Sequence, residues 1–463
     1  MKNILSIFLF IFTVTLTQAQ PLPHPRQIAW QQWETTAFLH FTVNTFTDKE
    51  WGDGTESPTI FNPTNFNARE MVKTLKETGF KLVLLTAKHH DGFCLWQTKL
   101  TEHCIRNSPY KNGKGDIVGE IAAACKEFGL KFGVYLSPWD RHEPSYGTSS
   151  YNDFYKSQLR ELLTQYGEIY EVWFDGAKGE NAKDMEYDFK GIWAIVRQLQ
   201  PKAVMFSDVG PDVRWVGNES GNAGETCWSM LTITDEKTLA EKGKWAGKAV
   251  APGKADEKYL NTGDKNGTSW IPAETDVSIR PGWFFHDAEN DKVRSPQNIL
   301  NLYYKSVGRN SLLLLNIPPD RRGMLHENDV ASLRTFRSIL DETFKTNLAM
   351  GSVKKKLIDK KIASDTPLSI NKPFIINFKK NTIFDRALFQ ENIMKGQRIE
   401  KAKLEYWDGA HWELVQEFTT IGYKRLLRFP IITSNKIRFT ILEAKTPRVY
   451  LSDIGFYKAS DRE

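Results

Sequence analysis

The sequence predicts an α/β protein, a (β/α)8-like barrel followed by a C-terminal antiparallel β-sandwich. Short apolar strands alternate with amphipathic helices through most of the chain, as in a parallel sheet covered by helices. No glycine-rich phosphate loop is present, which favours a barrel over an open doubly wound sheet. From about residue 350 onward the pattern changes to short alternating runs, typical of antiparallel strands with one wet face.

The strands of the predicted barrel are continuously apolar. Residues 81–87 form such a run, which is expected when both faces of a strand are covered. The most apolar strand of the chain is followed by Pro318 and Pro319, which terminate it. Together the expected strands are residues 37–41, 81–87, 131–137, 168–174, 203–206 and 311–316.

Helices are expected between these strands because apolar residues recur there at helical spacing. Asp116 is placed to cap the helix that Gly129 ends, and Gly79 and Gly167 are the stop signals of two others. The expected helices are residues 68–78, 116–128, 151–166, 187–199, 295–307 and 327–344.

The remaining segments are less regular. Residues 210–281 are rich in Gly, Asn, Asp and Lys, which predicts long loops, with residues 226–230 as a candidate sixth strand. Beyond residue 350 a turn at Asp408 and Gly409 separates two alternating runs. The strands expected in this C-terminal part include residues 374–378, 403–407, 436–441 and 449–456.

The composition is that of a globular, exported protein. With 463 residues, of which 40% are hydrophobic, the chain is long enough for a large barrel and a smaller domain. The net charge of +6 is spread without a basic block, so nucleic-acid binding is not expected. Lys2, the apolar residues 4–16 and the small-residue site ending at Ala19 are typical of a cleaved secretory signal.

Three parts of the chain are therefore expected. They are a signal peptide at residues 1–19, a catalytic barrel at 20–347 and a β-sandwich at 348–463. Cleavage of the signal would leave a periplasmic or extracellular protein without a membrane anchor.

The four cysteines are Cys94, Cys104, Cys125 and Cys227. Export permits disulfides, and the spacing allows a Cys94–Cys104 bridge. Free buried thiols are equally compatible, because a domain of this size does not need cross-links. The spacings match no zinc or haem pattern.

Polar side chains follow the ends of the predicted strands. His40 closes the first strand, His89 and His90 follow the second, Tyr135 lies near the end of the third, Asp175 closes the fourth and Asp208 the fifth. In an α/β barrel these strand ends meet at one face, and that face carries the active site. The convergence predicts a catalytic site around Asp175, with neutral imidazoles available to hydrogen-bond substrate hydroxyls.

Other chemistries have less support in the sequence. Adjacent residues of a strand point to opposite faces, so His89 and His90 would not both reach one metal ion unless the strand had already ended. No G-x-S-x-G motif supports a serine nucleophile. We expect neither a metal nor a cofactor, and a metal-dependent hydrolase is the alternative that sensitivity to a chelator tests.

If the site hydrolyses a glycoside, Asp175 requires a second carboxyl group. Trp215 precedes Glu219 and could shield it from water, which would raise the pKa of that carboxyl as a general acid requires. Glu225 is its nearest rival, because it directly precedes the candidate strand at 226–230. Glu274 and Asp276 are the other candidates in this part of the chain.

Four motifs together resemble the α-L-fucosidases of glycoside hydrolase family 29. They are Phe-Leu-His-Phe at 38–41, Ala-Lys-His-His-Asp-Gly-Phe at 87–93, Gly-Val-Tyr-Leu-Ser-Pro at 133–138 and Val-Trp-Phe-Asp-Gly at 172–176. Their order and spacing make the resemblance specific, and it extends from about residue 25 to 345.

The resemblance implies a retaining mechanism with Asp175 as the nucleophile. The segment Arg-Trp-Val-Gly-Asn-Glu at 214–219 resembles the subgroup that cleaves α-1,3 and α-1,4 fucosyl branches, in which Glu219 matches the acid/base. Arg-Pro-Gly-Trp at 280–283 resembles a segment that lines the sugar site. The C-terminal part resembles the non-catalytic, carbohydrate-binding-like domain of these enzymes. The implied fucose-binding residues are His40, Glu50, Trp51, His89, His90, Tyr135 and Trp173, with Trp283 as a further candidate.

The expected function is release of L-fucose from fucosylated oligosaccharides or glycoconjugates, without a cofactor. A glycosidase of another specificity, for example for a galactoside, is one alternative. A fucose-binding protein without activity is another, and the presence of both Asp175 and Glu219 argues against it. The sequence does not indicate an oligomeric state.

Overall fold

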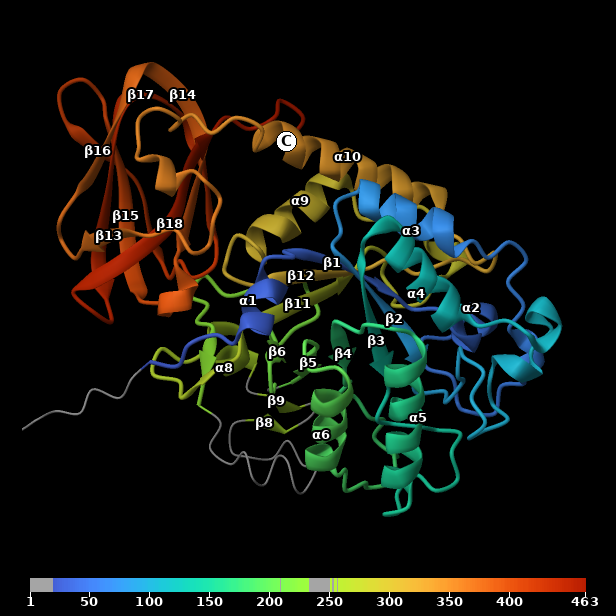
Figure 1. Ribbon diagram of the computed structural model, residues 1–463. Coiled ribbons are helices and arrows are strands. Elements are labelled where there is room, and N and C mark those ends of the chain that lie inside the picture. Colours follow the sequence, from blue (N-terminus) through green and yellow to red (C-terminus); the bar gives the residue numbers. More distant parts are fainter. Residues whose placement is uncertain (1–19, 209, 233–249, 252–253, 256) are drawn as a thin grey trace, which may run out of the picture.

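The protein folds into a parallel barrel and a C-terminal antiparallel sheet domain (Figure 1). The computed structural model describes residues 20–208, 210–232, 250–251, 254–255 and 257–463. The expected signal peptide at 1–19 lies outside these residues. The fold class predicted from the sequence is confirmed.

Eight parallel strands close the barrel in the order in which they follow along the chain. Apart from Lys131 and Trp215, every residue of these strands is buried, as their continuous apolar runs predict. The last strand returns to the first, with Leu313 paired to Thr35. The strands are β1 (Thr35–Leu39), β2 (Leu82–Lys88), β3 (Lys131–Leu136), β4 (Glu171–Trp173), β5 (Val204–Ser207), β6 (Val213–Trp215), β11 (Ala273–Ser278) and β12 (Leu312–Asn316).

Long helices between the strands cover the outside of the barrel (Figure 1). Asp116 caps α4 by accepting a hydrogen bond from the Gly119 amide, and Gly129 ends that helix with a left-handed φ of 69°. All six long helices lie within two or three residues of their predicted bounds: α3 (Ala68–Glu77), α4 (Ile117–Phe128), α5 (Tyr151–Gln165), α6 (Phe189–Leu199), α9 (Pro296–Lys305) and α10 (Glu327–Thr343).

Shorter helices occur in the connections. They are α1 (Pro25–Gln31), α2 (Val43–Thr47) and α8 (Glu257–Thr262), with 3₁₀ turns η1 (Pro58–Ile60), η2 (Ile105–Asn107), η3 (Tyr110–Gly113), η4 (Asp287–Glu289), η5 (Lys355–Leu357) and η6 (Ile393–Lys395). None of the helices in the described part of the chain is long and apolar enough to cross a membrane.

The region after β5 differs from the sequence prediction. The sixth barrel strand is β6, not residues 226–230, which was the wrong choice. Met230 begins β7 (Met230–Leu231), which pairs antiparallel with β10 (Ser269–Trp270) outside the barrel, while β8 (Val250–Ala251) pairs with β9 (Lys254–Ala255). The apolar residues before β7 instead face the C-terminal domain, where Trp228 packs with Ile393 and Tyr423.

The C-terminal domain is one hydrogen-bonded antiparallel sheet around a single hydrophobic core. Register shifts interrupt the pairing of its two longest strands, β14 and β17. The strand order is β13-β18-β14-β17-β15-β16. The strands are β13 (Thr366–Ser369), β14 (Phe374–Glu391), β15 (Ile399–Trp407), β16 (Trp412–Thr419), β17 (Arg425–Ala444) and β18 (Arg448–Tyr457).

The two domains share part of their packing. Leu388, Leu426 and Tyr457 of the C-terminal domain join the hydrophobic core of the barrel domain. The Leu426 amide donates to the Gly308 carbonyl just after α9, at 3.0 Å. The sheet therefore lies against the barrel near α9 and α10 (Figure 1).

All four cysteines are buried and free, so the structure contains thiols and not the Cys94–Cys104 bridge that the spacing allowed. The interior of the barrel holds a separate aromatic cluster that includes Phe38, Tyr135, Trp173 and Phe206. This cluster supports the residues at the carboxyl ends of the strands.

Candidate active site

A pocket of about 180 Å³ opens at the carboxyl ends of the barrel strands. It is smaller than the roughly 300–1,000 Å³ typical of sites for drug-sized ligands, and suits a single sugar ring. Every lining residue belongs to the barrel domain. They are Phe38, His40, Trp51, His89, His90, Trp173, Asp175, Gly176, Ala177, Phe206, Asp208, Trp215, Glu219, Asp276 and Trp283.

Asp175 follows β4 and is held by two hydrogen-bond donors. The Tyr135 hydroxyl donates to Oδ2 at 2.9 Å, and the Ala177 amide donates to Oδ1 at 2.8 Å. Burial and the charge of Asp175 raise the pKa of Tyr135 well above its usual value, so the phenol stays protonated and remains a donor. Tyr135 itself does not line the pocket, and its hydroxyl reaches the site through Asp175.

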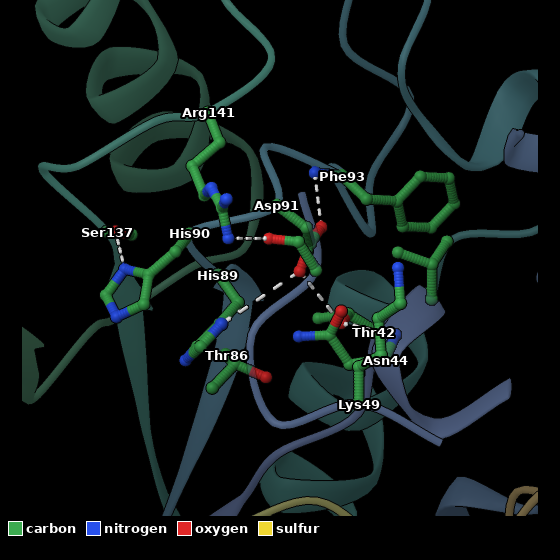
Figure 2. Close-up of polar contacts among 12 residues, drawn as sticks. Thr42, Asn44, Lys49, Thr86, His89, His90, Asp91, Phe93, Ser137 and Arg141 are labelled. Atoms are coloured by element: carbon green, nitrogen blue, oxygen red, sulfur yellow. Dashed lines mark hydrogen bonds and ion pairs between the residues drawn. The ribbon is translucent and has the colours of Figure 1, made fainter. Parts of the chain in front are cut away.

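His89 and His90 both line the pocket because β2 ends at Lys88, one residue before them. His90 Nδ1 lies 2.7 Å from the Ser137 hydroxyl, and His89 Nδ1 lies 4.0 Å from Asp91 Oδ2. Figure 2 shows the two rings pointing towards these different partners. His90 Nε2 lies 3.7 Å from Asp175 Oδ2. Burial lowers the pKa of His90 to about 4 and that of His89 well below its usual value, so both rings are neutral near pH 7.

His40 and Trp173 are each held by a hydrogen-bond partner that does not line the pocket, and Trp173 also stacks on a pocket residue. His40 Nδ1 lies 2.9 Å from Asn316 Oδ1, and burial lowers its pKa to about 3. The Trp173 indole donates to Glu274 Oε1 at 2.8 Å and stacks on Phe206 with ring centroids 4.1 Å apart. Their orientation is set before any ligand binds.

Glu219 lies at the mouth of the pocket, where the Trp283 indole donates to its Oε2 at 3.2 Å. The side chain is open to the pocket, but the surrounding protein desolvates its carboxyl group. Desolvation raises the pKa of Glu219, the charges of Asp175 and Glu50 raise it further, and the Trp283 hydrogen bond opposes the rise. The carboxyl is thus tuned towards the protonated form.

The structure separates Glu219 from its rivals. Glu225 lies at the domain interface, paired with Arg309 and, at 2.8 Å, with Arg425, and it does not line the pocket. Glu274 is fully buried inside the barrel. Asp276 does line the pocket, but it is buried and accepts a hydrogen bond from the Trp215 indole at 2.8 Å.

Two further acids contribute to the pocket wall. Burial, reinforced by the charge of Asp175, raises the pKa of Asp208 to about 7. Burial, reinforced by the charge of Glu219, raises that of Asp276 well above its usual value. Asp208 was recognisable in the sequence as the residue that ends the fifth strand, and Asp276 shares the inward parity of Glu274 on β11.

Glu50 and Trp51 occupy different positions. Trp51 is 46% exposed, lines the pocket and lies edge-on to His90 and Trp139. Glu50 does not line the pocket. Its carboxylate accepts hydrogen bonds from the amides of Trp283 and Phe284, at 2.8 and 3.1 Å.

No group of three or more His, Cys, Asp and Glu side chains that could hold a metal ion occurs among the residues whose positions are described. The polar groups of the pocket are carboxyls, neutral imidazoles and indoles, which suit hydroxyl-rich ligands.

The profile of a family described as Alpha-L-fucosidase matches residues 22–342. The chain belongs to the α-L-fucosidase family. It is thus a glycoside hydrolase, and two curated relatives match more than 90% of the chain. The Arabidopsis thaliana protein named Alpha-L-fucosidase 1 is 44% identical over 459 residues, covering 94% of this chain and 87% of the relative.

Solved structures of family members share the fold. A glycoside hydrolase 29 family member from an unknown rumen bacterium is 40% identical with a TM-score of 0.85, covering 96% of this chain and 78% of that one. A Ruminococcus gnavus family 29 fucosidase in complex with fucose is 34% identical with a TM-score of 0.86, covering 95% of both chains. This α-L-fucosidase family member therefore has the family's fold over both domains.

Proposed function

We propose that this protein is a retaining exo-α-L-fucosidase in which Asp175 is the nucleophile and Glu219 is the general acid/base. One observation carries the proposal. Asp175 and Glu219 line the same small pocket, where the first carboxylate is held by two donors and the second is desolvated. A fixed nucleophile and a carboxyl tuned towards its protonated form are the two groups that double displacement requires.

The reaction would proceed in two steps. An oxygen of Asp175 attacks the anomeric carbon while the bond to the leaving oxygen breaks, and Glu219 gives its proton to that oxygen. The fucosyl–Asp175 ester is then hydrolysed: Glu219 takes a proton from water, the water oxygen bonds the anomeric carbon, and Asp175 leaves as a carboxylate. Configuration at the anomeric carbon is retained because it inverts twice.

The remaining pocket residues fit a single fucose unit. Neutral His40, His89 and His90 can each donate to or accept from a sugar hydroxyl. Phe38 and Phe206 give the pocket apolar surface that can cover the C6 methyl group of fucose. A galactoside would place a hydroxyl against such a wall, which an apolar pocket disfavours.

We further propose that the substrates are α-1,3- and α-1,4-fucosylated glycans. The segment at 214–219 that resembles the branch-specific subgroup supplies Trp215 and Glu219 to the pocket, where the aglycone would leave. We also propose that the protein is exported by a signal peptide at residues 1–19, which is cleaved near Ala19. Comparison of Lewis-type trisaccharides with α-1,2- and α-1,6-fucosides tests the linkage, and N-terminal analysis of the secreted protein tests the cleavage.

The decisive experiment compares Asp175→Ala and Glu219→Ala on a Lewis-type trisaccharide and on an aryl fucoside with a good leaving group. Asp175→Ala should lose almost all activity on both substrates. Glu219→Ala should lose roughly 10²–10⁴-fold on the trisaccharide and far less on the activated substrate, with azide restoring its turnover. If Glu225→Ala shows that pattern instead, Glu219 is not the acid/base.

A further inference from the structure

We propose that Glu50 and His286 are positioning residues that hold Trp283 in place and, through its indole, orient the carboxyl group of Glu219. With Asp48 they form what we call the loop latch. The inference rests on the proposed role of Glu219 as the acid/base. It assigns a function to His286, and it gives Glu50 a role other than contact with the sugar.

The latch joins two loops that follow different barrel strands. Glu50 lies in the connection between β1 and β2, and Trp283 lies between β11 and β12. Glu50 Oε2 accepts from the Trp283 amide at 2.8 Å, and Oε1 accepts from the Phe284 amide at 3.1 Å. Two successive backbone amides bound to one carboxylate fix both the position and the direction of the chain at Trp283.

The loops approach too closely for a larger residue. A Cβ added at Gly282 would lie 2.5 Å from Glu50 Oε1 and 3.0 Å from the His286 ring. The Gly282 amide also donates to Glu289 at 3.2 Å. The backbone before Trp283 is thus packed directly onto the latch.

His286 lies between two carboxylates. Its Nε2 is 2.7 Å from Glu50 Oε1, and its Nδ1 is 2.8 Å from Asp48 Oδ1. A carboxylate only accepts, so both ring nitrogens need an N–H, and only the imidazolium carries two. The neutral ring would leave one nitrogen lone pair facing a carboxylate.

Other charged groups surround the latch. Arg321 lies 3.5 Å from Asp48 and 3.2 Å from Asp287, so it shares Asp48 with His286. Glu50 and Asp48 raise the pKa of His286, against the effect of burial. The charge on His286 is therefore complete below its ordinary pKa of about 6.5 and is lost as the pH rises through the raised value.

The loop latch is connected to Glu219 through the side chain of Trp283. The Trp283 indole donates to Glu219 Oε2 at 3.2 Å. The Asn316 side-chain amide donates to the Trp283 backbone carbonyl at 2.8 Å and so helps to hold this residue. Glu50 itself is absent from the pocket wall. Glu50 can therefore act on the reaction through the placement of Trp283.

The test is a ratio, kcat/KM on a Lewis-type trisaccharide divided by kcat/KM on an activated aryl fucoside. Loss of fucose binding or of folded enzyme lowers both terms equally, whereas misplacement of the general acid lowers only the first. We expect His286→Phe and Glu50→Gln to lower the ratio about tenfold, since small displacements of catalytic groups cost up to about 10²-fold. His286→Gln keeps one hydrogen-bond donor, so the ratio should fall less in this variant, by about threefold at most.

Controls separate the outcomes. His411→Phe makes the same change at an exposed histidine of the C-terminal domain and should leave the ratio unchanged. Glu219→Ala must lower the ratio, and if it does not, the proposed acid/base role fails. If Glu219→Ala lowers the ratio while His286→Phe and Glu50→Gln do not, the latch is wrong. Equal loss on both substrates in Glu50→Gln, with the amount of folded enzyme and its unfolding midpoint unchanged, would mean that Glu50 binds the sugar and would overturn the positioning role.

A second measurement does not depend on turnover. The ¹³Cε1 resonance of His286, assigned by its loss in His286→Phe, should titrate above about 6.5, the ordinary value for histidine. Asp48→Asn should move that titration to lower pH, because it removes one of the two carboxylates. Titration at or below the ordinary value in the wild-type protein would overturn the imidazolium latch.

Discussion

Gly176 offers a sharp test of how Asp175 is positioned. Gly176 directly follows Asp175 and lies against the carboxyl group of Asp208. A Cβ at this position would lie 2.6 and 2.7 Å from the two Asp208 carboxylate oxygens and 2.9 Å from Cγ. Gly176→Ala therefore cannot be accommodated without movement of either Asp208 or the backbone next to the nucleophile.

The size of that movement sets the expected effect. Ordinary contacts of a Cβ begin at about 3.4 Å, so the closest pair must separate by about 0.8 Å. Asp208 is buried, which leaves it little room to retreat. Misplacement of a catalytic group by about 1 Å can cost about 10²-fold, so we expect kcat/KM to fall by about 10- to 100-fold. The loss should be equal on activated and natural substrates, because it concerns the nucleophile.

Removal of the clashing partner provides the control. Asp208→Ala deletes the carboxyl group, so the double variant Gly176→Ala/Asp208→Ala should recover to within about threefold of Asp208→Ala alone. A double-mutant cycle on kcat/KM measures this coupling. Wild-type activity in Gly176→Ala, or a loss that Asp208→Ala does not relieve, would refute the steric account.

Three further predictions concern the rest of the site. Cleavage of the trisaccharide should fall as the pH rises through the raised pKa of Glu219, since the acid must be protonated, and the pH profile of kcat/KM measures this. Glu225→Ala should change the substrate ratio by less than about twofold, because its carboxylate pairs with arginines at the domain interface; kinetics on both substrates decide it. Arg280→Met should lower the free energy of unfolding by about 3–5 kcal/mol, because it leaves the fully buried Asp329 unpaired; denaturant unfolding measures this. The double variant Arg280→Met/Asp329→Leu removes both charges and should recover most of that loss.

Much of the fold was accessible from local sequence patterns. Strand burial on both faces and helix periodicity are properties of short segments. The strands β1 to β5 and β12 were therefore predicted from the sequence, as were the six long helices α3, α4, α5, α6, α9 and α10. The same patterns located Asp175, because a strand that ends in a carboxylate places it at the carboxyl-terminal face of a barrel whatever the rest of the chain does.

The connections between β5 and β11 were harder to predict, because loops lack periodicity. Residues 226–230 are apolar enough for a barrel strand, yet they pack on the C-terminal domain. The sequence does not distinguish a barrel strand from a segment packed on the C-terminal domain, because the same apolar side chains are buried in both. Only the folded chain shows β6 in the barrel and Glu225 at the domain interface.

The sequence by itself determined the barrel, its position in the chain and the strand-end residues that meet in the pocket. The tertiary structure decided that Glu219 lines the pocket with Asp175 whereas Glu225 does not, and that Glu50 accepts hydrogen bonds from the backbone at Trp283. The reason is physical: strand-end positions follow from alternation within one segment, whereas contacts between loops depend on how far two distant segments are brought together by the closed barrel.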